Sequence, residues 1–167
     1  MSEIQFIPEC NADTALLLAL GIPDSYINKA DNNSKIAKSM ISQSRHYHKR
    51  LIGLTDLDKK NIPSYFGQFE EIRSGHDIFY KKKSDCQHFL IFLKPAVEKW
   101  LLKAASKVDI SISDFGFQSD VKVLKNETTH IKIRDDKNFR NFILAIKNAE
   151  SPAMKFLTDI IKEHYEL

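Results

Sequence analysis

The sequence has few of the residues that mark specialised small proteins. It contains 2 Cys, 5 Gly and 5 Pro among 167 residues. Cys10 and Cys86 are far apart and neither has a second Cys nearby, so the chain carries neither a disulfide framework nor a zinc knuckle. Both are predicted to be free thiols in a reducing compartment. The scarcity of Gly and Pro predicts long elements and few loops.

Long apolar runs are also missing. No apolar stretch approaches the roughly 20 residues that span a bilayer, and the longest, 88–93, has the length of a strand. The N-terminal residues lack the basic start and long apolar run of a signal peptide. These absences predict a cytoplasmic protein with no membrane partner.

The chain has no Gly-rich phosphate loop and no nucleophile elbow, which argues against nucleotide-dependent enzymes of those kinds. His46 and His48 have no further ligands beside them that would make a metal pair. The formal charge of +3 is too small to require a nucleic-acid partner and does not exclude one.

What is present is the composition of an ordinary globular protein, with 43% hydrophobic and 28% charged residues. The length fits one domain, 1–167, with a full-sized core. In the first third, apolar runs and amphipathic stretches alternate. They predict strands at 4–8, 25–30 and 50–55 and helices at 12–20 and 35–49. The alternation predicts an α/β, Rossmann-like, mainly parallel sheet with helices on both faces.

The rest of the chain predicts further elements. After a connection over 59–77 with a short helix, the pattern predicts two strands and then a helix that opens at a proline, at 77–83, 87–93 and 96–107. Residues 109–133 have no clear period, and two amphipathic helices follow at 137–149 and 152–164. We therefore expect a core at about 4–107 and a helical extension at 108–167.

Acidic residues follow two of the predicted strands. Glu9 ends the first strand, and Asp56 and Asp58 end the third. Ligands gather at the carboxyl ends of parallel strands, and Mg²⁺ prefers carboxylate oxygens, so the three acids predict a magnesium site. Acids after strands also cap helices, and an Asp-x-Asp arises by chance in an acidic chain, so both readings stay open.

Two motifs carry a family resemblance. The run FIPECNADTALLLALGI and the later LIGLTDLD resemble a Toprim domain, the module of topoisomerases, DnaG-type primases and OLD-family nucleases. The resemblance implies that Asp56 and Asp58 hold Mg²⁺ or Mn²⁺, that Glu9 is an acid/base or further ligand, and that Asp13 matches the family's later Asp. The chain departs from the family at Cys10, where a Gly is usual, and after Asp58, where Lys59-Lys60-Asn61 replace a further acid.

A second resemblance is to small stand-alone Toprim-like proteins linked to phage defence and mobile elements. They carry a Pro and then Glu-x-Trp at the start of a helix, and KPAVEKWLL supplies Pro95, Glu98 and Trp100. Glu98 would reach the acidic site from the first helical turn. Alternatively, Trp100 is a core residue and Glu98 only favours the helix dipole.

Cations and aromatic residues lie near these motifs. Basic runs stand at 45–50, at 81–83 and at Lys59-Lys60, and an aromatic group stands at 65–69. The lysines would neutralise a phosphodiester, with Lys59 steadying the phosphate, and Tyr65, Phe66 and Phe69 would stack bases. Solvated surfaces and core packing explain the same residues.

Three functions follow from these patterns. The first is a Mg²⁺-dependent Toprim-like nuclease or phosphotransferase acting on nucleic acid, working with a partner protein such as an ATPase. The second is a Toprim-like module that has lost catalysis and binds a partner or nucleic acid. The third is a doubly wound domain with a small-molecule site at the switch point of its sheet.

Overall fold

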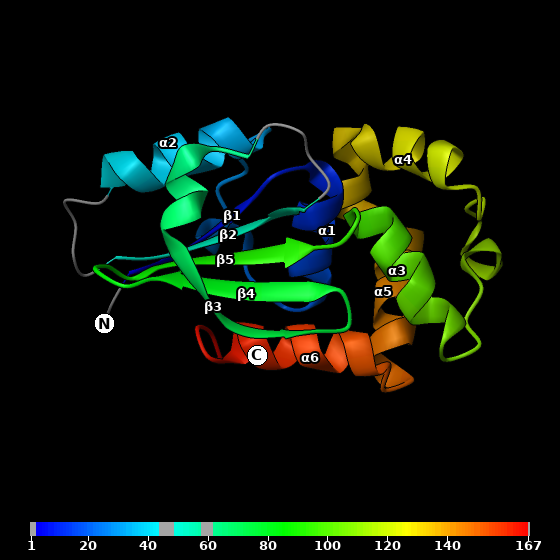
Figure 1. Cartoon of the computed structure of the whole chain (residues 1–167). Helices are drawn as coiled ribbons and strands as arrows, with labels where there is room; N and C mark the ends of the chain where they lie inside the picture. The colour runs from blue at the N-terminus through cyan, green and yellow to red at the C-terminus, as the bar shows by residue number, and fades with distance from the viewer. Residues whose placement is uncertain (1–2, 44–48, 58–61, 167) are drawn as a thin grey trace.

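The computed structural model describes residues 3–43, 49–57 and 62–166 (Figure 1). The strands are β1 (Ile4–Pro8), β2 (Arg50–Asp56), β3 (Phe69–Gly75), β4 (Ile78–Lys83) and β5 (His88–Leu93). The helices are α1 (Asn11–Ala19), α2 (Asn33–Gln43), α3 (Val97–Ser106), α4 (Val121–Thr129), α5 (Lys137–Asn148) and α6 (Pro152–Lys162). Short 3₁₀ segments lie at Asp24–Tyr26, Ser64–Gln68, Ile112–Phe115 and Ile131–Asp135. Within the described part of the chain, no helix has the length and hydropathy to cross a membrane.

The five strands form one mixed sheet in the order β1-β2-β5-β4-β3. β1, β2 and β5 are parallel, whereas β4 is antiparallel to both β5 and β3. Among the described residues, two strand pairings are parallel and two are antiparallel, so the sheet is mixed and the prediction of a mainly parallel sheet is not confirmed. His76 and Asp77, both at positive φ (53° and 60°), join β3 to β4. Two such residues form the tight hairpin turn that makes neighbouring strands antiparallel.

The prediction of a regular strand at 25–30 is wrong. Asp24–Tyr26 is a 3₁₀ turn, and Ile27 makes only an isolated parallel bridge with Phe6. The next residues still run along β1, because the Asn28 N–H donates to the Phe6 carbonyl at 2.8 Å and the Ala30 N–H to the Pro8 carbonyl at 2.9 Å. The segment therefore covers the outer edge of β1 without becoming a regular strand.

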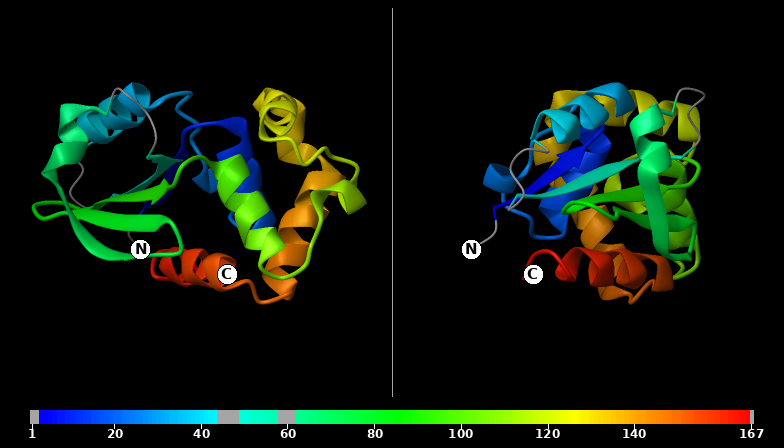
Figure 2. Two further views of the ribbon diagram at one scale, coloured as in Figure 1. Left: turned by 45° about the vertical axis from the view of Figure 1, so that its right-hand side comes forward. Right: turned by 60° about the vertical axis from the view of Figure 1, so that its left-hand side comes forward.

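Helices cover both faces of the sheet, as predicted. On one face, α2 and the Ser64–Gln68 turn pack on a smaller hydrophobic cluster, and on the other α1, α3, α5 and α6 share the main one (Figures 1 and 2). Gly53, at the centre of β2, allows α2 to lie close. A Cβ at this position would lie 2.8 Å from Leu90 Cδ2 and 3.0 Å from Ile36 Cγ2.

The helices predicted at 137–149 and 152–164 are confirmed as α5 and α6, with ends within a few residues. Their buried residues join the same cluster as the sheet, so residues 108–167 contribute to the main core. The stretch 109–133, which has no clear sequence period, contains α4. Only Leu124 and Thr128 of α4 are buried, which explains why its period is weak. Asp120 caps α4 by accepting from the N–H groups of Lys122 and Val123.

Candidate functional site

A cavity of about 250 Å³ lies at the carboxyl ends of β1 and β2. Its charged lining comprises Glu9, Asp31, Asp56, Glu98, Lys29 and Lys125. Three residues that the sequence singled out, Glu9, Asp56 and Glu98, thus line one cavity from three different elements. Asp58 and Lys59 lie outside the described residues.

Glu9 is buried directly after β1, and β2 holds it in place. Its N–H continues the strand ladder to the Leu54 carbonyl at 2.9 Å. The Thr55 hydroxyl donates to Glu9 Oε2 at 2.5 Å, and the Asp56 N–H reaches the same oxygen at 3.4 Å. Thr55 also contacts the side-chain amide of buried Asn33. The contact is to Asn33 Oδ1, which is an acceptor, so the single hydroxyl proton of Thr55 serves one of two oxygens, Glu9 Oε2 or Asn33 Oδ1, at a time. The carboxylate is therefore oriented by a buried network.

Asp56 ends β2 and meets the start of α3. Its Oδ1 accepts from the Val97 N–H at 3.1 Å, and the N-cap residue Ala96 provides no cap of its own. Asp56 thus caps α3 from a different element, which satisfies one of the unpaired N–H groups of the first turn. The alternative interpretation, that an acid after a strand caps a helix, is therefore confirmed for Asp56. It does not exclude metal binding, because a carboxylate oxygen has more than one lone pair.

Glu98 is buried in the first turn of α3 and accepts from the Thr128 hydroxyl of α4 at 2.7 Å. The α3 Trp100 is a core residue, 1% exposed, whose indole N–H donates to the His76 carbonyl at 3.0 Å. The interpretation of Trp100 as a core residue is therefore confirmed. Glu98 both occupies the helix N-terminus, where the dipole favours an anion, and lines the cavity.

Cys10, the residue directly before Asn11, is the N-cap of α1. Cys10 and Asp13 form a capping box, in which Asp13 Oδ2 accepts from the Cys10 N–H at 3.1 Å and from Cys10 Sγ at 3.0 Å. Cys10 has an extended backbone, with φ −133°, so the position does not need the glycine that the Toprim family usually has there. Asn11 donates to the Thr129 carbonyl at 2.8 Å.

Asp13 is completely buried behind the cavity. Burial, followed by the nearby charge of Asp56 and then of Glu9, raises the pKa of Asp13 well above its usual value, which favours the neutral acid. Burial and the neighbouring Asp13 likewise raise the pKa of the Cys10 thiol. The raised pKa values favour the neutral forms of both side chains, which together cap α1 through hydrogen bonds.

Among the described residues, no group of three or more His, Cys, Asp or Glu side chains is arranged to hold a metal ion. The predicted ligand set of Glu9, Asp56 and Asp58 includes a residue outside that part of the chain, so it stays a prediction. The oxygen-rich lining is nevertheless of the chemical kind that a hard divalent cation takes.

The other cations and aromatic residues singled out in the sequence lie elsewhere. Tyr65, Phe66 and Phe69 are buried in the smaller hydrophobic cluster, so they are core residues and do not stack on bases. Lys82 and Lys83 end β4 beside the start of β5, at the end of the sheet opposite the cavity. Of the basic run 45–50, residues 45–48 lie outside the described residues.

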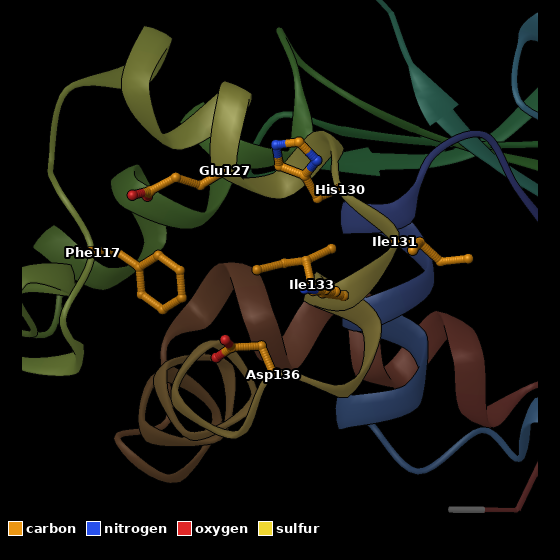
Figure 3. A pocket seen from close by; sticks show the side chains of 7 residues that line it. Phe117, Glu127, His130, Ile131, Ile133 and Asp136 are labelled. Atoms are coloured by element: carbon orange, nitrogen blue, oxygen red, sulfur yellow. The ribbon is translucent and has the colours of Figure 1, made fainter.

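A second pocket, of about 470 Å³, lies beside α4 and α5 (Figure 3). Phe117, Glu127, His130, Ile133 and Asp136 are among the residues that line it. Asp136 is engaged there as the N-cap of α5, accepting from the Phe139 N–H at 2.9 Å. α4 contributes residues to both cavities.

Sequence reasoning missed the residues that hold the acids in place. Thr55, Asn33 and Thr128 carry no motif, and only Thr55, beside Asp56 on a buried strand, had a position that hinted at its role. No protein-family model, curated protein or solved structure gives a significant match to this chain. The Toprim resemblance therefore stays an interpretation of the residues themselves.

Proposed function

We propose that the chain is a Toprim-like, Mg²⁺- or Mn²⁺-dependent phosphoryl-transfer protein, of the nuclease type, that acts on nucleic acid. One observation carries the proposal: Glu9, Asp56 and Glu98, from the end of β1, the end of β2 and the start of α3, line one cavity. Such convergence costs Coulomb energy unless a cation is bound, and a divalent cation offsets that repulsion.

Each residue has a role in this proposal. Asp56 ligates the metal together with Asp58, as the Toprim resemblance implies, and Glu98, which lines the same cavity as Asp56, is a further candidate. Glu9, fixed by Thr55, is a further ligand or transfers a proton. A bound divalent cation supplies orientation of the phosphate and activation of water. Lys59 is the phosphate-binding cation expected from the sequence.

A second function is favoured by a different observation. Each of the three carboxylates already accepts a hydrogen bond from the protein: Glu9 from Thr55, Asp56 from Val97 and Glu98 from Thr128. Such bonds also hold acids in a fold that no longer uses them for catalysis. The second candidate is therefore a Toprim-like binding module that recognises nucleic acid or a partner protein such as an ATPase.

Metal titration calorimetry with Mn²⁺ and Mg²⁺ tests the proposal on wild type, Asp56→Asn and Asp31→Asn. Asp56→Asn keeps an oxygen that caps Val97 while removing the charge, so we expect the fold to persist and metal affinity to fall by at least about tenfold, which is about 1.4 kcal/mol. Asp31 lines the same cavity at positive φ (71°), which Asn tolerates, so Asp31→Asn is a matched control for charge. It should change the affinity less than about threefold.

Nicking of supercoiled plasmid under the same conditions separates the two functions. Metal-dependent nicking that is lost in Asp56→Asn supports the enzyme. Metal binding without nicking supports the binding module. Equal metal binding by wild type and Asp56→Asn would exclude the proposed site.

A further inference from the structure

α4 forms one wall of the acidic cavity and is attached to it at two points. The Thr128 hydroxyl donates to Glu98 Oε1 at 2.7 Å, and Asn11 of α1 donates to the Thr129 carbonyl at 2.8 Å. Glu98 and Thr128 are both buried, so water competes little for the first bond. These bonds place the last turn of α4 against α1 and α3.

The attached turn brings one lysine to the cavity. Lys125 lies one turn before Thr129 and lines the cavity together with Glu9, Asp56 and Glu98. It is exposed, and it forms no ion pair with any carboxylate in the described ranges 3–43, 49–57 and 62–166. Lys125 therefore places a positive charge at the cavity that is not engaged in an ion pair with the described acids.

The other lysine of the cavity is engaged differently. Lys29 pairs with Asp31, and Asp31 also pairs with Lys35 at 3.0 Å. This pairing lowers the ability of Lys29 to attract an anion. Of the two cavity lysines, Lys125 is thus the one whose charge is available to a ligand.

We propose that Lys125 contacts a phosphate of the nucleic-acid strand bound at this cavity, an inference that rests on the proposed function. Carboxylates repel a phosphodiester, and a metal ion in the site neutralises only part of that charge. A lysine at the edge of the cavity supplies a further positive charge to the phosphate and leaves the metal ligands to the metal. The 109–133 stretch, which the sequence left unassigned, thereby contributes a positioning residue.

Strand binding by Lys125→Gln tests the inference, with Lys122→Gln as a matched control. Lys122 is an exposed lysine of the same helix, one turn earlier, and it does not line the cavity. Both variants lose one charge from the same exposed helix, so their net charge is equal. The probe is a fluorescent single-stranded oligonucleotide of 12 nucleotides, measured by anisotropy with Ca²⁺ in place of Mg²⁺ over a range of salt concentrations.

We expect Lys125→Gln to weaken strand binding by about fivefold or more at low salt, and Lys122→Gln by less than twofold. The slope of log affinity against log salt should fall by about 0.7 for Lys125→Gln, because one phosphate contact on a single strand is lost. Metal affinity, measured by calorimetry, should stay within about threefold of wild type, since Lys125 does not ligate the metal.

The experiments distinguish a wrong role for Lys125 from a wrong proposed function. If Lys125→Gln and Lys122→Gln weaken strand binding equally while metal binding still depends on Asp56, the role of Lys125 is wrong and the proposed function stands. If wild type binds the metal but no strand, the Lys125 contact is likewise overturned. If metal binding does not depend on Asp56, the proposed function fails, and the inference fails with it.

Discussion

The C-terminal His164 makes the stability of this protein sensitive to mild acid. It follows α6, is buried, and its Nε2 lies 2.7 Å from the Tyr80 hydroxyl of β4. Its ring also packs on Phe89, with the ring centroids 4.5 Å apart. Burial, and then the charge of Arg50, lower the pKa of His164 from 6.5 to about 4. The folded protein therefore holds this histidine neutral.

The lowered pKa of His164 determines how the free energy of unfolding depends on pH. Between pH 4 and pH 6.5 the unfolded chain binds a proton at His164 and the folded chain does not, so the free energy of unfolding falls as the pH is lowered through this range. The stabilisation is complete above the unfolded pKa of 6.5. With a folded pKa of about 4, lowering the pH from 7.5 to 5 removes about 2 kcal/mol.

Urea unfolding of wild type and His164→Phe at several pH values between 5 and 7.5 measures this contribution. Phe keeps the ring but cannot titrate. Burial also lowers the pKa of His88, which therefore contributes in the same direction and remains in the variant. The difference between the two proteins isolates His164. We expect the wild type to lose about 2 kcal/mol more than the variant between pH 7.5 and 5.

A parallel pH dependence in both proteins would refute the reasoning, because it would place the folded pKa of His164 near 6.5. Tyr80→Phe is a useful companion. It removes the hydroxyl partner while the ring still buries His164, so its pH dependence should resemble that of wild type. A flat profile in Tyr80→Phe would assign the effect to the Tyr80 hydroxyl rather than to burial.

Two further substitutions test packing and capping by thermal or urea unfolding. Gly53→Ala should destabilise by about 1–3 kcal/mol, because its Cβ would lie 2.8 Å from Leu90 Cδ2 of β5 and 3.0 Å from Ile36 Cγ2 of α2 in a packed core. Unchanged stability would contradict this close approach of α2. Cys10→Ala should cost about 1 kcal/mol through the lost cap of α1, while Cys10→Ser, which can donate to Asp13, should stay near wild type. Equal stability of the two Cys10 variants would argue against the side-chain cap.

The parts of the fold that the sequence predicts well are those with strong local patterns. The apolar runs 4–8, 50–55 and 87–93 are the parallel strands β1, β2 and β5. Glu9 and Asp56, which follow the first two of these runs, line one cavity, because parallel strands end at the same edge of a sheet. Amphipathic periods likewise locate α5 and α6.

The parts that the sequence does not predict depend on contacts distant in the chain or on unusual turns. The β3–β4 hairpin turns at His76 and Asp77, which lack the Asn-Gly or Asp-Gly pair that marks such turns, so its antiparallel edge has no clear local signal. Residues 27–30, of which Asn28, Lys29 and Ala30 are poor strand formers, run along β1 and make only one isolated bridge with it. α4 buries too few residues to show a period.

The same contrast applies to the site. The acids are visible in the sequence because strand ends and an Asp-x-Asp mark them, whereas the groups that orient them come from other elements. Thr55 acts on Glu9 across the β1–β2 pair, and Thr128 reaches Glu98 from α4, 30 residues along the chain. α5 and α6, which follow α4, are embedded in the main core. The cavity is therefore a product of the first strands and of the C-terminal helices together, and its acids are held in their observed positions only in the whole fold.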